Sequence, residues 1–127
     1  MTMHRSKSAI AAQCPIRDVL DRLGDRWTVL VLRELKDGTL RFSVLKARIA
    51  DISQRMLAQT LRRLEQDGLV LRTVHPVVPP RVDYGLTALG ESLLVPLEGM
   101  VQWADENHDA VRVARSRYIP PEPNRPR

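Results

Sequence analysis

Cysteine is nearly absent from the chain, aromatic residues are scarce, and long apolar runs are missing. The single cysteine, Cys14, excludes an intrachain disulfide framework and a zinc cluster built on several thiolates. No run approaches the ~20 apolar residues that cross a bilayer, and residues 1–12 lack the apolar stretch of a signal peptide. We therefore expect a cytoplasmic protein that makes no membrane contact and is stabilised by packing alone.

The chain nevertheless has enough apolar residues to bury a core. Hydrophobic residues make up 43% and charged residues 28% of its 127 residues, an ordinary globular balance. This length suits one domain. Four prolines fall in the last eight residues, a composition typical of disorder. We expect one domain over residues 14–118, a flexible arm over residues 1–13 and a disordered tail over residues 119–127.

Positive charge is concentrated in the middle of the chain. Lysine and arginine number 20 against 15 acidic residues, for a net charge of +5. The segment from Arg41 to Arg81 alone carries this excess, whereas the segment from Val82 to Asp109 is acidic and has no lysine or arginine. Such segmentation is expected of a surface that meets a polyanion on one side. A solvated basic face without a partner is the alternative.

Apolar spacing predicts three helices in the first part of the chain. An amphipathic helix should start at Pro15 and end at Gly24. The run Trp27–Leu35 is apolar on most sides, so its helix should lie in the middle of the core. A shorter stripe over Phe42–Ile49 predicts a third helix, with Lys46 and Arg48 on its outer face.

A fourth helix has the strongest start and stop signals. Ser53 is a good N-cap, Ile52 before it can pack against Leu57, and Gly68 supplies the left-handed stop after about fifteen residues. Its core stripe is formed by leucines, and at ~100° per residue its long polar side chains point away from that stripe. These outward residues are Arg55, Gln59, Arg62 and Gln66, with Arg63 at the margin.

Beyond Gly68 the apolar period changes from helical to alternating. The segments Leu69–Val74 and Val82–Leu86 predict a hairpin, and Val82, Tyr84 and Leu86 alternate with Asp83 and Gly85 in its second strand. The connection from His75 to Arg81 contains three prolines, so it should form a stiff, extended loop.

A further helix should follow this hairpin. Thr87 can cap it, Pro96 should kink or break it, and a separate short helix over Val111–Tyr118 is expected.

The resulting order, four helices, two strands and a helix, predicts a mainly α protein with a small β-hairpin. It is the order of a winged helix-turn-helix domain with flanking N- and C-terminal helices. A major groove admits one helix, whose arginine and glutamine side chains can bond guanine and adenine, while cations of the wing meet phosphates or a minor groove. The residues predicted to contact double-stranded DNA are Lys46, Arg48, Ser53, Gln54, Arg55, Gln59, Arg62, Arg63 and Arg81. A merely soluble arginine-rich helix is the alternative.

The chain resembles the HxlR-type family of transcriptional regulators, relatives of the MarR winged-helix proteins. The motifs that carry the resemblance extend from Cys14 to about Tyr118. They are Cys14-Pro15-Ile16, Gly24-Asp25-Arg26-Trp27-Thr28, Arg41-Phe42-Ser43, Ile52-Ser53-Gln54-Arg55-Met56-Leu57, Leu64-Glu65-Gln66-Asp67-Gly68-Leu69-Val70, and Pro79-Pro80-Arg81-Val82-Asp83-Tyr84 leading to Leu86-Thr87. Arg26 and Gly85 depart modestly from the family pattern. The resemblance implies a homodimer in which the N-terminal helix and the helices after the wing pair two subunits over a palindromic operator.

The apolar residues after Thr87 favour a homodimer without reference to the family, because they offer more apolar surface than the core of a small domain needs. A partner chain could cover this surface. Packing onto the chain's own core is the alternative.

Cys14 is a candidate redox sensor, because it lies near a helix N-terminus and beside Arg17, which favour a thiolate. The resemblance adds that some relatives sense oxidants or electrophiles through a cysteine in this region. The alternative is an inert buried residue.

The sequence therefore predicts a homodimeric, sequence-specific DNA-binding regulator, a repressor rather than an activator. A winged-helix module that contacts an acidic protein through its basic face is the alternative. We expect no enzyme, no cofactor and no metal site, because the three histidines are scattered and no phosphate-binding glycine loop occurs. A small-molecule effector remains open, since Trp27, Met100 and Trp103 could line a pocket or belong to the core.

Overall fold

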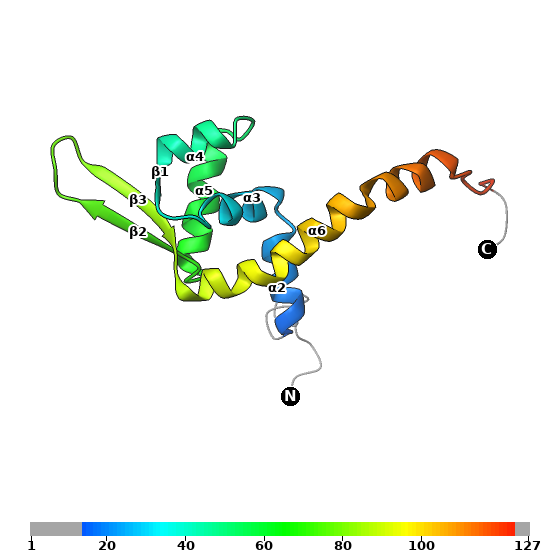
Figure 1. Cartoon of the computed structure of the whole chain (residues 1–127), viewed down its shortest axis with the longest axis horizontal. Helices are drawn as coiled ribbons and strands as arrows, with labels where there is room; N and C mark the ends of the chain where they lie inside the picture. The colour runs from blue at the N-terminus through cyan, green and yellow to red at the C-terminus, as the bar shows by residue number, and fades with distance from the viewer. Residues whose placement is uncertain (1–13, 124–127) are drawn as a thin grey trace. The chain divides into compact units, whose positions relative to one another are not determined.

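The computed structural model describes residues 14–123 and contains five helices and three strands in that range (Figure 1). Residues 1–13, predicted to be a flexible arm, lie outside the described residues, as do residues 124–127 of the predicted tail. The elements, in chain order, are α2 (Pro15–Leu23), α3 (Arg26–Glu34), β1 (Leu40–Arg41), α4 (Phe42–Arg48), α5 (Gln54–Gln66), β2 (Val70–His75), β3 (Arg81–Leu86) and α6 (Ala88–Arg117). The chain divides into two compact units after Leu94, within α6.

The core of the first unit is built from one side each of α3, α4 and α5. Val31 and Leu32 of α3, Leu45 of α4 and Leu57 of α5 are completely buried. Burying a leucine or valine side chain contributes about 1.5 to 3 kcal/mol, so this cluster fixes how the three helices pack. The predicted central position of α3 is only partly right, because Leu30 on its other side is 38% exposed.

Helix α5 follows the sequence prediction closely. Its N-cap is Ser53, whose hydroxyl accepts a hydrogen bond from the backbone N–H of Met56 at 3.0 Å. Gly68 has a φ of +74°, the left-handed conformation that ends the helix at little cost for glycine. The predicted leucine stripe, Leu57, Leu61 and Leu64, is buried. These features hold the helix in one orientation, with its opposite face toward solvent.

The three strands form one antiparallel sheet in the order β1-β3-β2. The hairpin of β2 and β3 was predicted, and its strands pair in register from Val70 opposite Leu86 to His75 opposite Arg81. Figure 1 shows this hairpin extending beyond the helices of the first unit. Strand β1 was not predicted, because two residues carry no period. It places Leu40 opposite Tyr84 and Arg41 opposite Asp83. The helix pair α4 and α5 followed by this hairpin is a winged helix-turn-helix.

The alternation in β3 is as predicted, but its buried residues are the polar and small ones. Asp83 and Gly85 are buried, whereas Val82, Tyr84 and Leu86 are half-buried. Asp83 accepts a hydrogen bond from Arg81 and lies 3.0 Å from Nε2 of His75. Gly85 is covered by Thr39, whose Cγ2 would lie 2.7 Å from a Cβ built on the glycine. Apolarity alone therefore misjudges the inner face of this strand.

A kink or a break was predicted at Pro96; helix α6 is continuous through this residue, so the break does not occur. Proline removes one backbone donor, and the remaining hydrogen bonds on both sides keep the helix intact. The predicted separate helix over 111–118 is the end of α6, which stops at Arg117. Thr87 caps α6 as predicted, because its hydroxyl accepts the N–H of Gly90 at 3.1 Å.

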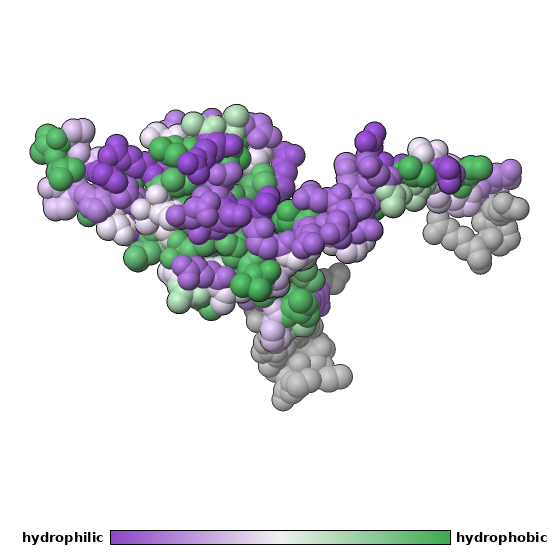
Figure 2. Space-filling view, viewed as in Figure 1, coloured by the Kyte–Doolittle hydropathy of each residue, from purple (hydrophilic) through white to green (hydrophobic). Residues whose placement is uncertain are grey.

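Apolar side chains stay exposed on both units. Helix α2 has no buried residue, and Ile16 and Leu20 on its apolar stripe are 63% and 54% exposed. In the second unit, Met100 and Trp103 are exposed to a similar degree. Apolar surface also lies at the outer end of the hairpin, where Val78 is 99% exposed (Figure 2).

Candidate nucleic-acid interface

The outer face of α5 carries most of the residues predicted to read DNA. Gln54, Arg55 and Arg62 are exposed, and Gln59 is half-buried among them. Arg55, Ala58, Gln59 and Arg62 line a hollow of about 240 Å³. Arg55, Gln59 and Arg62 follow helical spacing, so together with Gln54 they form one polar strip opposite the buried leucines. Arginine and glutamine are the residue types that make paired hydrogen bonds to guanine and adenine.

Ser53 and the predicted residues of α4 lie beside this helix. The Ser53 hydroxyl uses its oxygen to cap α5, which leaves its proton free to donate to an anion. Lys46 is half-buried and Arg48 is exposed. Arg48 forms an ion pair with Glu34 of α3, with Nη1 and Oε2 3.6 Å apart. Part of the predicted charge of α4 is therefore balanced within the chain.

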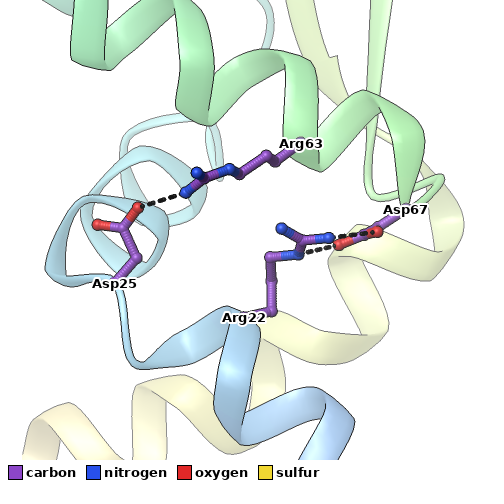
Figure 3. A network of polar contacts seen from close by, with 4 residues as sticks. All are labelled: Arg22, Asp25, Arg63 and Asp67. Carbon is purple, nitrogen blue, oxygen red and sulfur yellow. Dashed lines mark hydrogen bonds and ion pairs between the residues drawn. The ribbon is translucent and has the colours of Figure 1, made fainter. Parts of the chain in front are cut away.

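Arg63 is held by an acidic side chain of the same chain. Its Nη1 lies 3.5 Å from Oδ2 of Asp25, at the start of α3 (Figure 3). Asp25 also caps α3 by accepting the backbone N–H of Trp27 at 3.0 Å. The Arg63 side chain is 39% exposed, so it lies at the margin of the strip, as predicted from its helical angle. The sequence could not show this pairing, because Asp25 and Arg63 meet only through the packing of α3 on α5.

A second ion pair joins α2 to the end of α5. Arg22 binds Asp67 in bidentate fashion, with Nε donating to Oδ2 and Nη2 to Oδ1 (Figure 3). Asp67 is the C-cap residue of α5. Bidentate arginine–carboxylate pairs have defined geometry, so this contact fixes the last turn of α2 against the end of α5.

The wing carries a charged cluster that the sequence analysis resolved only in part. Arg81, which was predicted, donates its Nε–H to Oδ1 of Asp83 at 3.1 Å. His75 Nε2 lies 3.0 Å from the other oxygen, Oδ2. The hydrogen bond from Arg81 lowers the pKa of the Asp83 carboxyl, and the hydrogen bond from His75 lowers it further, although burial opposes both.

A hollow of about 700 Å³, here called the wing hollow, lies next to this cluster. It is lined by residues 41–43, His75 and residues 77–82. Sequence reasoning missed Arg41, Ser43 and His75 as parts of a common site. The predicted hairpin offered part of the signal, because its register places His75 opposite Arg81. The pairing of Arg41 with Asp83 depends on β1, which the sequence does not reveal.

Cys14, the candidate redox sensor, is half-buried and is not part of a disulfide. It is the N-cap residue of α2, and its side chain makes no capping hydrogen bond. Within residues 14–123, no group of three or more His, Cys, Asp or Glu residues is arranged to hold a metal ion. No helix in this range is both long and apolar enough to span a membrane.

Known proteins with similar sequences and structures are transcriptional regulators. The chain is 46% identical to the uncharacterized HTH-type transcriptional regulator YtfH of Escherichia coli over 105 residues, which cover 83% of each protein. The structure of the putative transcriptional regulator YtfH from Salmonella typhimurium matches with a TM-score of 0.75 and 45% identity, covering 85% of this chain and 96% of that one. The redox regulator HypR in its reduced form matches with a TM-score of 0.75 and 36% identity, covering 79% and 99%.

The family assignment agrees with the order of elements and with the position of the polar strip on α5. The model of the HxlR-like helix-turn-helix family matches residues 22–112, a range that includes α3, the helix pair, the wing and most of α6. The chain therefore belongs to the HxlR-like helix-turn-helix family of transcriptional regulators.

Proposed function

We propose that the protein binds double-stranded DNA sequence-specifically and represses transcription as a homodimer at a palindromic operator. The observation that carries this proposal is the polar strip of α5, where Gln54, Arg55 and Arg62 are exposed on a helix with a rigidly packed opposite face. A helix of this kind fits the major groove, where these side chain types distinguish base pairs. The wing supplies further cations for the backbone.

The test is selection of bound sequences from a random duplex pool by the purified protein. We expect enrichment of a palindrome by the wild type and its loss in an Arg55→Ala, Arg62→Ala double variant. An Arg112→Ala, Arg115→Ala variant is the matched control, because it removes the same charge from exposed positions of α6. Failure of the folded, reduced wild type to enrich any sequence would overturn the proposal and favour a protein-interaction module.

The homodimer is supported by the apolar surface that each unit leaves exposed. Ile16 and Leu20 of α2 and Met100 and Trp103 of α6 would each gain from burial against a second copy. We expect Trp103→Asp to shift the protein toward monomer in sedimentation velocity. His108→Asp, on an exposed polar position of the same helix, should leave the mass unchanged. A monomeric wild type at micromolar concentration would contradict the dimer.

Repression is testable once an operator is known. When the enriched palindrome overlaps a promoter, added protein should lower the yield of transcript in a purified transcription reaction. The Arg55→Ala, Arg62→Ala variant should leave that yield unchanged. A rise in transcript with the wild type would identify an activator instead.

An oxidant or electrophile is the effector class that the proposal includes. The support is the free, half-buried thiol of Cys14 at the start of α2, together with the similarity to a protein described as a redox regulator. Thiol modification should change operator affinity in the wild type and have no effect in Cys14→Ser. Equal responses of both proteins would show that Cys14 is an inert residue.

A further inference from the structure

We propose that an ion-pair cluster at the joint between α2 and α3 sets which spacing of DNA half-sites the protein accepts, because it fixes the angle between α2 and α5. The cluster consists of Arg22, Asp25, Arg63 and Asp67, here called the hinge clamp (Figure 3). The inference rests on the proposed function, in which α2 contributes to the contact with a second subunit and α5 lies in the major groove.

Helix α2 has little packing of its own against the rest of the first unit. Residues 15–21 are exposed, and only Arg22 and Leu23 in the last turn are half-buried. A helix that buries no side chain along its length has no packed ridge that would fix its direction. The contacts of its last turn therefore decide how α2 is oriented.

The hinge clamp joins both sides of the short connection between α2 and α3 to the end of α5. Arg22, before the connection, donates to Asp67 in bidentate fashion, with Nη2 and Oδ1 3.1 Å apart. Asp25, the last residue of the connection, forms the ion pair with Arg63, one turn earlier on α5. A swing of α2 about Gly24 would break the first pair and leave the second in place. The first pair thus holds the α2 side of the joint, and the second holds the α3 side.

A bidentate ion pair is suited to holding an angle. The guanidinium and the carboxylate are planar, so rotation of one group out of line breaks both hydrogen bonds. Asp67 is the C-cap residue of α5, a helix whose leucines are buried, so the carboxylate is attached to a fixed part of the first unit. The orientation of α2 therefore follows the orientation of α5.

A fixed angle between α2 and α5 limits the operators that a dimer can bind. With α2 held against the second subunit, this angle determines how far apart the two α5 helices lie. One additional base pair between half-sites moves them about 3.4 Å further apart and rotates one by about 35° around the DNA axis. A rigid dimer loses base contacts on one side when the spacing changes, whereas a dimer with a free hinge can follow the change.

The first test compares affinity for the enriched palindrome with affinity for versions that have one base pair added or removed at the centre. The wild type should bind the original spacing about tenfold more tightly or better, as expected when base contacts are lost. Arg22→Gln and Asp67→Asn should reduce this ratio to about threefold or less, because a hinge that moves lets both subunits keep their contacts. A base substitution within a half-site should weaken binding of all three proteins equally. A wild type that accepts all spacings, or an unchanged ratio in both variants, would overturn the inference.

Two controls separate the ion pair from a general effect of charge or stability. Glu65→Gln removes the same charge as Asp67→Asn from an exposed position in the last turn of α5, so it should keep the wild-type ratio. The double variant Arg22→Gln, Asp67→Asn should match each single variant, because all three lack the same contact. An equal loss in Glu65→Gln, or a further loss in the double variant, would assign the effect to charge or folding and reject the hinge clamp.

A measurement without DNA separates failure of the hinge clamp from failure of the proposed function. Spin labels are attached at Asp18→Cys of α2 and Gln54→Cys of α5, two exposed positions, in a Cys14→Ser background. Dilution with unlabelled protein restricts the measured distance to one protomer. The distance distribution should be narrow with an intact clamp and broader in Asp67→Asn.

The outcomes of this measurement differ for the two proposals. Broadening in a protein that enriches no DNA would retain the hinge clamp and overturn the proposed function. Identical distributions with and without Asp67→Asn would overturn the hinge clamp, whatever the operator affinities are.

Discussion

Thr60 of α5 is a buried residue whose hydroxyl has no partner. It is 1% exposed, and its Oγ1 accepts and donates no hydrogen bond. A buried polar group without a partner keeps its desolvation cost. Thr60→Val has nearly the same shape and similar helix propensity, so it should raise the free energy of unfolding by about 1 kcal/mol.

Denaturant unfolding of this variant beside Thr60→Ser provides the check. Serine retains the hydroxyl but lacks the buried methyl group, so it should lower stability by about 1 kcal/mol. A destabilised Thr60→Val would mean that the hydroxyl has a water partner.

Gly90 occupies a position where any side chain would collide with the backbone. A Cβ built there would lie 2.1 Å from the carbonyl oxygen of Leu69, which cannot move without displacing β2. Gly90→Ala should therefore lower the free energy of unfolding by about 3 kcal/mol, despite the better helix propensity of alanine. Ser92→Ala, two residues further along at an exposed position, should change it by less than about 0.5 kcal/mol. Thermal unfolding of the two variants makes this comparison, and equal midpoints would contradict it.

Two neighbouring arginines of α5 should differ in their effect on DNA binding. Arg62 is exposed and lines the hollow of the polar strip, whereas Arg63 is paired with Asp25. Arg62→Gln should weaken operator binding about tenfold or more. Arg63→Gln should weaken it less and lower stability by roughly 0.5 kcal/mol, the usual contribution of a partly exposed ion pair. Binding curves for both variants decide this, and a larger effect of Arg63→Gln would place Arg63 at the bases.

The wing should lose its charged cluster in acid. The pKa of Asp83 is lowered from its ordinary value of 3.8, so the unfolded chain takes up the proton first as the pH falls. The stabilisation by Asp83 is fully present above that value and disappears as the pH falls through the lower folded pKa. Unfolding midpoints measured between about pH 2 and about pH 5 should therefore converge for the wild type and Asp83→Asn. A constant difference across this range would contradict the shift.

The sequence predicted helices and hairpin where local signals agree with packing. Ser53, the leucine stripe and Gly68 all identify α5, because each of these signals can be read from neighbouring residues of the sequence. Strand β1 was missed because its pairing with β3 depends on residues about forty positions apart. A kink or a break was expected at Pro96, and the break does not occur, because the helical residues on both sides of one proline continue the same long helix.

The candidate site, like the fold, could be predicted only where the signal lies within one helix or strand. Helical spacing identified Arg55, Gln59 and Arg62 as one face. It could not show that Arg48 and Arg63 have acidic partners on or beside α3, nor that Asp83 draws His75 and Arg81 together. These pairings depend on which elements pack against each other, and the apolar period along one element carries no information about its neighbours.

The charge distribution of the whole chain predicts strong dependence of DNA binding on salt. The net charge of +5 arises between Arg41 and Arg81, the segment that forms the helix pair and the wing. If about six to ten phosphates are contacted per dimer, operator affinity should fall by roughly 10³ to 10⁵ between 50 and 200 mM salt. Fluorescence anisotropy over this range measures the slope. A flat response would argue against a phosphate-anchored complex.

The two faces of α5 also bear on how this protein could diverge. The buried residues are Leu57, Thr60, Leu61 and Leu64, whereas Gln54, Arg55 and Arg62 of the polar strip are exposed, so no residue belongs to both sets. Substitutions at exposed helix positions usually change stability by less than about 0.5 kcal/mol. After gene duplication, a copy could therefore acquire a new operator by drift on one face while selection for folding acts on the other. Among related regulators that bind different operators, substitutions should then be more frequent at these three positions of α5 than at the core positions.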